Sequence, residues 1–471
     1  MTTGEQVSLA LRLAFPSIIS QLVTIAMEYL DTAMVGHLGA AASASIGLVS
    51  TTTWLMGGMC SALAGGFVVM LAQSIGAKDV VRARAILRQA ILFTLVVSSI
   101  VGVIGIMIAQ HLPYWLGGGE DIAHDAYIYF LVFAAAIPIW EMSFLLASML
   151  RSAGNMLVPS VVNIAVCVLD VAFNYLFIFV LGKGVLGAAL GSLCAISIGT
   201  VVFFVYVLVF SEELGVRQKS VVDEDERRKL LVQETKGEPI LGPAMKIGVP
   251  MAVQHIALCS AHIVSTMIVA PLGTIAIAAH SFGITIEGLC YMPGYGIGDA
   301  AITLVGQSIG AKRADLQRSL SVVTLWLGIV FMTFMGVLMY FGVQYLMPLM
   351  TPDMAVQELT TRILRIEAFA EPMYAASIVA YSIFVGSGDT KVPVIMNLGS
   401  MWIVRLPAAC LLSGTMGLVG VWIAMCGELC FRGIIFLVRL RIKSGLHPSK
   451  TVINNIKYYV QTYFIRQRIR R

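Results

Sequence analysis

Charged residues are scarce in this chain of 471 residues. Asp, Glu, Lys and Arg make up 12% of it and apolar residues 58%, whereas roughly 25% of a soluble globular protein is charged. Water is therefore not the solvent for most of the surface. Since each crossing of a bilayer takes roughly 20 apolar residues, the length predicts about a dozen membrane helices.

The motifs of several enzyme classes are also missing. There is no GxxxxGK[ST] loop to hold ATP phosphates, and there is no HExxH or GxSxG motif. The eight cysteines form no CxxC pair, which argues against a zinc site and against a disulfide framework. We therefore expect no enzymatic activity, no metal and no cofactor.

The sequence repeats itself at an offset of 234 residues. The hexapeptide QSIGAK at 73–78 returns at 307–312, Pro16 returns as Pro250, and Gly154 returns as Gly388. An offset of this size is too long for a solenoid repeat and marks two copies of one large bundle. Duplicated membrane bundles are typical of transporters, whose sites lie where the copies meet.

Twelve apolar runs predict an all-α integral membrane fold with twelve transmembrane helices in two pseudo-symmetric six-helix bundles. The runs are 14–37, 43–71, 86–112, 126–150, 157–181, 184–211, 246–271, 275–306, 318–346, 358–385, 391–414 and 416–440. The predicted parts are a bundle at 1–211, a cytoplasmic linker at 212–243, a bundle at 244–440 and a basic amphipathic tail at 441–471.

The basic residues predict how the chain lies in the membrane. They cluster after crossings two, four, eight and ten, whereas the opposite loops hold little more than Lys183 and Arg362. The positive-inside rule then places both QSIGAK loops and both termini in the cytoplasm. We expect the first crossing to serve as its own insertion signal. The basic tail is expected to bind an anionic lipid surface rather than nucleic acid.

Two helices carry polar stripes where lipid-facing residues would be apolar. One stripe lies on crossing one and consists of Gln21, Thr24, Glu28 and Asp31. The other lies on crossing five and consists of Asn163, Cys167, Asp170 and Asn174. Steps of three and four place each stripe on one helix face. An ionisable residue at membrane depth costs about 3 kcal/mol on insertion scales and usually faces a bundle interior or a hydrated cavity.

The two stripes predict an ion site in the first bundle. Carboxyl groups with amide partners in a small hydrated chamber can hold a proton or a small cation, because burial and a second carboxylate favour the protonated acid. The predicted ion-coupling residues are Asp31, Asp170, Asn174, Asn163 and Glu28. Hydrogen bonding between helices is the alternative role, and for Glu28 it is equally favoured.

The second copy does not repeat these carboxylates. At the offset of 234, Asp31 becomes Ser265, Asp170 becomes Val404 and Asn174 becomes Ala408. Other polar residues predict a substrate cleft: Gln21, His262, Glu287, Tyr291, Glu367 and Glu371. Pro372 directly follows Glu371 and predicts a break or kink in crossing ten. Glu428 and Arg432, four residues apart, are expected to pair.

Four segments together resemble the multidrug and toxic compound extrusion (MATE) family. Residues 31–36 (DTAMVG), after Pro16, resemble its first-crossing signature, and 305–311 (VGQSIGA) resembles the end of its eighth crossing. Residues 150–155 (LRSAGN) and 184–189 (GVLGAA) resemble its segments after crossing four and at the start of crossing six. The resemblance covers about 10–440 and is nearest the prokaryotic DinF-like branch.

The resemblance implies a fold of two six-helix bundles and a secondary antiporter in the cytoplasmic membrane of a prokaryote. Asp31 matches the first-crossing Asp that carries the coupling ion. The DinF-like branch has Asn and then Asp four residues later on crossing five, whereas this chain has Asp170 and then Asn174. Crossing seven lacks the Glu of the sodium-coupled NorM-like branch, which favours protons over sodium.

The expected function is multidrug efflux, in which amphipathic or cationic organic compounds leave in exchange for protons or sodium. A monomer in the lipid bilayer would suffice, because both bundles are on one chain. The alternative is a flippase for lipid-linked sugars with the same superfamily architecture. A flippase for anionic lipid phosphates would need basic groups in the cleft, and Arg405 and Arg432 are the candidates.

Overall fold

A computed structural model describes residues 2–211, 214 and 239–444. These residues are almost entirely helical and form no strand. The helices of the first half are α1 (Thr3–Gly36), α2 (Ala40–Gly76), α3 (Val80–Ile108), α4 (Leu112–Trp115), α5 (Glu120–Ser152), α6 (Leu157–Tyr175) and α7 (Gly184–Val205). Short π-helical turns, η1 (Leu176–Val180) and η2 (Tyr206–Phe210), extend α6 and α7.

The second half continues with a similar series. Its helices are α9 (Leu241–Val269), α10 (Thr274–Gly310), α11 (Ala314–Met350), α12 (Met354–Glu367), α13 (Glu371–Gly386), α14 (Lys391–Gly399), α15 (Leu406–Met416) and α16 (Leu418–Ser444). The turn η3 (Ala270–Leu272) follows α9, and η4 (Ser400–Arg405) joins α14 to α15.

The predicted twelve crossings are confirmed for the described part of the chain. Eleven helical spans are long and apolar enough to cross a membrane, and α12 with α13 forms a twelfth that bends by 58°. The bend lies at Pro372, in the first turn of α13. Pro fits the first turn of a helix but cannot continue the one before it. The predicted interruption of crossing ten is therefore also confirmed.

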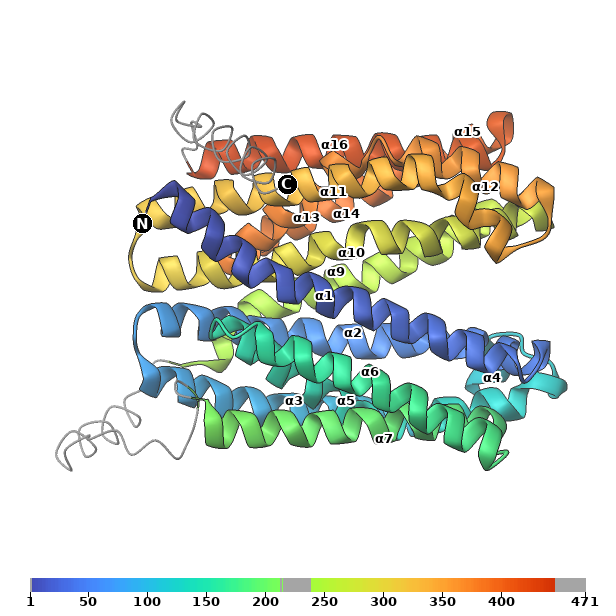
Figure 1. Ribbon diagram of the computed structural model, residues 1–471, viewed down its shortest axis with the longest axis horizontal. Helices are drawn as coiled ribbons and strands as arrows, with labels where there is room; N and C mark the ends of the chain where they lie inside the picture. The colour runs from blue at the N-terminus through green and yellow to red at the C-terminus, as the bar shows by residue number, and fades with distance from the viewer. Residues whose placement is uncertain (1, 212–213, 215–238, 445–471) are drawn as a thin grey trace, which may run out of the picture. The chain divides into compact units, whose positions relative to one another are not determined.

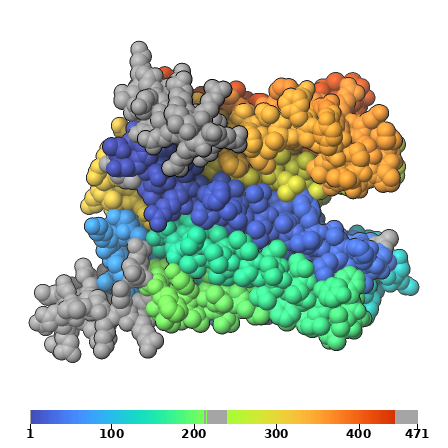
Figure 2. All heavy atoms as spheres, in the orientation of Figure 1, coloured from blue at the N-terminus to red at the C-terminus, as the bar shows by residue number. Residues whose placement is uncertain are grey.

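Residues 20–260 form one compact unit, which we call the N-terminal unit. Its central helix is α5, which packs against α2, α3 and α7, while α6 packs against α7 (Figure 1). The side chains of α6 and α7 cover one face of this unit (Figure 2). The fully buried side chains of Phe67, Leu145 and Phe203 belong to its core.

The described residues of 1–19 and 261–444 form the other compact unit, the C-terminal unit. Here α10 and α11 pack against each other and against α13, and α13 packs against α16 (Figure 1). The core contains Trp422, which is fully buried and donates a hydrogen bond from its indole to His280 Nδ1 at 3.2 Å.

Two helices, α1 and α9, each divide between the two compact units. Residues up to Ile19 pack with the C-terminal unit, and residues up to Ser260 pack with the N-terminal unit. Glycines allow this packing, because a Cβ at Gly296 would lie 2.7 Å from Ile18 N and one at Gly66 would lie 2.0 Å from Ala244 O.

The compact units therefore group residues differently from the predicted bundles 1–211 and 244–440. Most of the predicted linker, residues 212–213 and 215–238, lies outside the described residues, and so does the predicted tail from 445 onward.

The repeated loops have repeated backbone conformations. Lys78 and Lys312 are the two non-glycine residues with positive φ in the described chain, at 59° and 55°. In both loops the backbone amide of the residue after the lysine donates a hydrogen bond to a carbonyl in the last turn of the preceding helix. Asp79 N donates to Ser74 O and Arg313 N donates to Ser308 O, each at 3.0 Å. The offset of 234 therefore corresponds to a repeat in structure as well as in sequence.

Candidate functional site

Three predicted ion-coupling residues meet in the N-terminal unit. The side-chain amide of Asn174 donates one hydrogen bond to Asp31 Oδ1 at 2.8 Å and another to Asp170 Oδ2 at 3.1 Å. Asp31 lies on the second half of α1, and the other two lie one turn apart on α6. The helical spacing of the α6 stripe explains why the amide and the carboxyl group share a face. We call Asp31, Asp170 and Asn174 the carboxyl–amide cluster.

The two α6 residues of the cluster are buried. Asp170 is 0% exposed and Asn174 is 1% exposed, while Asp31 is half-buried. Asp170 Oδ1 and Asn174 Oδ1 are buried and have no hydrogen-bond partner in the described structure. The hydroxyl of Tyr129, on α5, interacts electrostatically with the carboxyl groups of Asp31, Asp170 and Glu28. The nearby groups are thus acids, amides and a phenol rather than bases.

A glycine on α7 makes room for the amide. A Cβ at Gly191 would lie 2.0 Å from Asn174 Oδ1 and 2.9 Å from Asn174 N. Any other residue here would displace the amide from the two carboxyl groups.

The other residues of the two stripes lie outside this cluster. Asn163 donates from its amide to Ser20 Oγ at 2.6 Å, so it joins α6 to α1 seven residues before Asp170. Glu28 is exposed and Gln21 is half-buried. The described contacts thus bring Asp31, Asp170 and Asn174 together, and they place Asn163 with Ser20 instead.

The predicted substrate-cleft residues of the second half lie in the C-terminal unit. Glu367 and Glu371 are each 1% exposed, and none of their carboxyl oxygens has a hydrogen-bond partner in the described structure. Glu287 is also buried, and the charges of Arg405 and Arg432 reach it. His262 is within reach of the same two arginines. The ring of Tyr291 packs edge-on against Tyr295 and Tyr374.

The predicted pair on α16 is confirmed. Arg432 Nη2 donates to Glu428 Oε2 at 2.9 Å, and both residues are buried. Glu428 also accepts a hydrogen bond from Ser400. Arg432 lies over the ring of Tyr374 at 5.7 Å from its centroid. A buried charge pair with such additional contacts holds α16 against η4 and α13.

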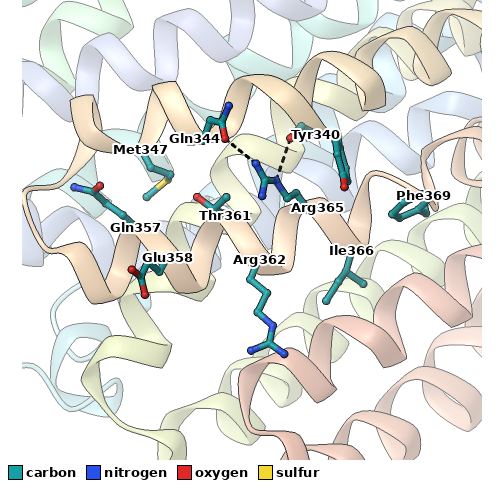
Figure 3. A pocket seen from close by; sticks show the side chains of 10 residues that line it. All are labelled: Tyr340, Gln344, Met347, Gln357, Glu358, Thr361, Arg362, Arg365, Ile366 and Phe369. Atoms are coloured by element: carbon teal, nitrogen blue, oxygen red, sulfur yellow. Dashed lines mark hydrogen bonds between the residues drawn. The ribbon is translucent and has the colours of Figure 1, made fainter.

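A groove of about 560 Å³ lies between α11 and α12 (Figure 3). Within it, Arg365 donates to Gln344 Oε1 at 2.8 Å and to the carbonyl of Tyr340 at 3.3 Å. Arg362 points away from this pair of contacts (Figure 3). The groove contains none of the predicted site residues, and its Arg365 is held by the Gln344 side chain and the Tyr340 backbone carbonyl.

Tyr129, Gly191 and Glu141 were not predicted from the sequence. Tyr129 and Gly191 complete the surroundings of the carboxyl–amide cluster, and neither belongs to a polar stripe. Glu141 stands alone in an apolar helix, but it is 2% exposed. A lone carboxylate in a membrane-spanning run is itself a signal of function, and that signal was present in the sequence.

The comparison with known families finds the same duplication. The family model described as MatE matches residues 16–176 and again 250–411, so the two matches begin 234 residues apart. Together they cover more than half of the chain. The chain belongs to the MatE family. This family consists of transporters that need no cofactor, so the protein is a transporter and not an enzyme.

Named relatives match along most of the chain. It is 25% identical over 456 residues to the "Probable multidrug resistance protein NorM" of Thermotoga maritima, covering 94% of this chain and 93% of the relative. It is 24% identical over 468 residues to human "Multidrug and toxin extrusion protein 1", covering 96% and 78%.

A solved structure has the same fold. The crystal structure of the Vibrio cholerae MATE transporter VcmN in the bent form matches with a TM-score of 0.82 at 19% identity. The match covers 94% of this chain and 97% of that one. The chain is therefore a multi-span membrane protein with a MATE transporter fold.

Proposed function

We propose that this transporter is an antiporter that exports amphipathic or cationic organic compounds in exchange for protons. Sodium is the second candidate for the coupling ion. Two relatives named for multidrug resistance and toxin extrusion support the substrate class. The basic loops at 73–78 and 307–312 support an orientation with those loops and both termini in the cytoplasm.

The observation that carries this proposal is the single amide shared by two carboxyl groups. Asn174 donates to both Asp31 and Asp170, so one amide group holds the two carboxyl groups close together. Two carboxylates that share a buried site cannot both ionise without strong repulsion. One of them therefore holds a proton, and that proton can be exchanged when the site opens to water.

Proton binding would act through the packing of α1. An ionised Asp31 requires hydration or a cation, whereas the neutral acid can be sealed among apolar side chains. Because α1 contributes residues to both compact units, repacking around Asp31 alters a helix that both units share. Coupling follows if the proton and the organic substrate favour different conformations.

Most of the remaining candidates for substrate binding lie in the C-terminal unit, whereas Gln21 lies in the N-terminal unit. Glu287, Glu367 and Glu371 are the acidic ones, and the polar candidates Gln21, His262 and Tyr291 are half-buried. Carboxyl groups without hydrogen-bond partners suit a positively charged ligand, because such a ligand would offset the cost of burying their charge.

The test is ethidium efflux from proteoliposomes under an imposed pH gradient or an imposed sodium gradient. We expect the pH gradient to drive efflux in the wild type and the Asp31→Asn variant to lose it. Ser265→Ala, at the matching position of the second half, is the control and is expected to transport normally. Full gradient-driven efflux by Asp31→Asn would refute the proposal. No efflux under either gradient by folded wild type would favour the flippase.

A further inference from the structure

The N-terminal unit contains a second buried carboxyl group away from the carboxyl–amide cluster. Glu141 lies on α5, is 2% exposed, and accepts a hydrogen bond at Oε2 from Ser61 Oγ on α2 at 2.8 Å. Its other oxygen, Oε1, lies 3.5 Å from where a Cβ at Gly57 would be. The Glu141 carboxyl group is thus packed against the face of α2 that carries the small residues Gly57 and Ser61.

No basic group neutralises Glu141. Ser61 is its one hydrogen-bond partner in the described structure, and no described ion pair includes it. The charge of Glu141 acts on the Cys60 thiol of α2, and His255 on α9 contacts the same helix one residue beyond Gly57. His255 sits against Gly58 and bonds to the carbonyl of Trp54 at 3.2 Å. From α7, the uncharged Thr200 donates a hydrogen bond to the carbonyl of Ile139 on α5 at 3.3 Å.

The neutral acid is the form that these surroundings favour. Burying an ionised carboxylate without a counter-charge costs several kcal/mol even after relaxation of the protein. One hydrogen bond from a serine hydroxyl offsets only a small part of that cost. A carboxyl group that is neutral at rest and ionises only briefly can accept and release protons. A purely structural hydrogen bond to Ser61 would not need an acid, since an amide oxygen accepts equally well.

Glu141 and the carboxyl–amide cluster lie at different depths of the membrane. Tyr129, which approaches the cluster, precedes Glu141 by 12 residues on the same helix. At about 1.5 Å per residue, the two levels are ~18 Å apart along α5. Glu141 is on the side of Arg151, toward the loops proposed as cytoplasmic. A proton held at the cluster must cover this distance to leave on that side.

The backbone of α5 offers a polar group between the two levels. Pro138 has no N–H, so it cannot make the helical hydrogen bond to the carbonyl of Ala134. Gly102 on α3 packs closely against that carbonyl, because a Cβ there would lie 2.7 Å from its oxygen. The Ala134 carbonyl is therefore a backbone acceptor without its helical donor, at a level between Tyr129 and Glu141 on α5.

We propose that Glu141 is a second proton-carrying residue, which receives protons leaving the carboxyl–amide cluster and releases them toward the cytoplasmic side. This inference rests on the proposed proton antiport. In the step, a proton from water binds one oxygen of the Glu141 carboxylate, and the acid later returns it to water nearer the loops at 73–78 and 307–312. The matching position of the second half is Ala375, so the relay belongs to the N-terminal unit alone.

Two variants separate proton transfer from the hydrogen bond. Glu141→Gln keeps an acceptor for Ser61 but cannot carry a proton, whereas Ser61→Ala removes the hydrogen bond and keeps the acid. In proteoliposomes we would measure ethidium efflux driven by a pH gradient, and ethidium exchange at equal pH, which needs no net proton movement. Glu141→Asp tests whether a shorter acid restores transport.

We expect Glu141→Gln to lower gradient-driven efflux at least tenfold while exchange stays within twofold of the wild type. Ser61→Ala should keep both rates, and Glu141→Asp should recover part of the driven rate. Normal driven efflux by Glu141→Gln, or equal losses in Glu141→Gln and Ser61→Ala, would overturn the inference. If Asp31→Asn still abolished driven efflux in the same vesicles, the antiport itself would stand.

Discussion

Asn174 on α6 and Ala408 on α15 occupy matching positions of the two halves, 234 residues apart. Asn174 bridges two carboxyl groups, whereas Ala408 and the neighbouring match of Asp170, Val404, have no polar side chain. Elsewhere in the two halves the backbone is alike, since Lys78, between α2 and α3, and Lys312, between α10 and α11, share a rare left-handed conformation. The repeat has kept the backbone that orients the helices and has changed the chemistry that they carry.

The second half has a different set of charges in its interior. Glu428 and Arg432 form a buried pair there, and their matches in the first half are Cys194 and Ile198. Among the described residues, the buried acids Asp170 and Glu141 of the N-terminal unit form no ion pair, whereas Glu428 of the C-terminal unit is paired with Arg432. A buried acid without a counter-charge favours binding of a proton, because the proton neutralises it. We therefore propose that the coupling ion binds in the N-terminal unit.

The largest effect is expected from Gly191→Ala. Its Cβ would collide with Asn174 and separate the amide from Asp31 and Asp170, so gradient-driven ethidium efflux should fall at least tenfold. The match of Gly191 in the second half is Met425, where no amide needs the space. Gly427→Ala is the control, because a Cβ there meets nothing within 4 Å. Normal efflux by Gly191→Ala would show that the bridging amide is dispensable.

The next effect concerns the charge pair of the C-terminal unit. Arg432→Met would leave Glu428 as an uncompensated buried carboxylate and should lower the free energy of unfolding by about 3–5 kcal/mol. Adding Glu428→Met to that variant should recover most of the loss, since an apolar pair of similar volume is tolerated. Unfolding in detergent, followed by circular dichroism, measures both variants. A double variant as unstable as the single one would contradict this account.

Two matching prolines should have opposite effects. Pro138 lies inside α5, where it removes a helical hydrogen bond, so Pro138→Ala should stabilise the fold by about 1–3 kcal/mol. Pro372 lies in the first turn of α13, where no such bond is lost, so Pro372→Ala should destabilise by about 1 kcal/mol or less. Unfolding in detergent, followed by circular dichroism, compares the two variants. Equal changes of the same sign in their free energies of unfolding would contradict the different roles given to Pro138 and Pro372.

The smallest effect concerns the loop between α13 and α14. Arg439 donates to Asp389 Oδ2 at 2.7 Å, and Lys443 contacts the same oxygen. In the first half the matching Asn155 instead donates to the Tyr206 hydroxyl at 3.1 Å. Asp389→Asn should therefore cost about 1 kcal/mol of stability. Asn155→Asp should gain nothing comparable, because the described side-chain partners of Asn155 are the uncharged Tyr206 hydroxyl and Val158 amide.

The same ion pair predicts a dependence on pH. Burial raises the pKa of Asp389, but Lys443 and Arg439 outweigh it, so the pKa falls below its usual 3.8. A lowered pKa stabilises the fold at pH above the unfolded value and ceases to do so as pH falls through the folded value. The difference in apparent Tm between wild type and Asp389→Asn should thus be constant above pH 5 and shrink below pH 4. A difference that grew on acidification would contradict the sign.

Much of the fold follows from local sequence patterns. The apolar runs predicted the crossings, Pro372 predicted the break in crossing ten, and the spacing of Glu428 and Arg432 predicted their pair. Helical periodicity also placed Asp170 and Asn174 on one face. Each of these depends on residues within about one or two turns of one another, and the chain itself fixes such distances.

Tertiary structure decided which of those faces meet. Asn174 reaches Asp31, whereas Asn163, on the same stripe, bonds to Ser20. Glu141 accepts a hydrogen bond from Ser61 on another helix. The helices α1 and α9 each divide between two compact units. The contacts depend on glycines far away in sequence, such as Gly191 beside Asn174 and Gly66 beside Ala244. Periodicity fixes the direction of a side chain on its own helix, but only the packing of the helices determines what lies opposite.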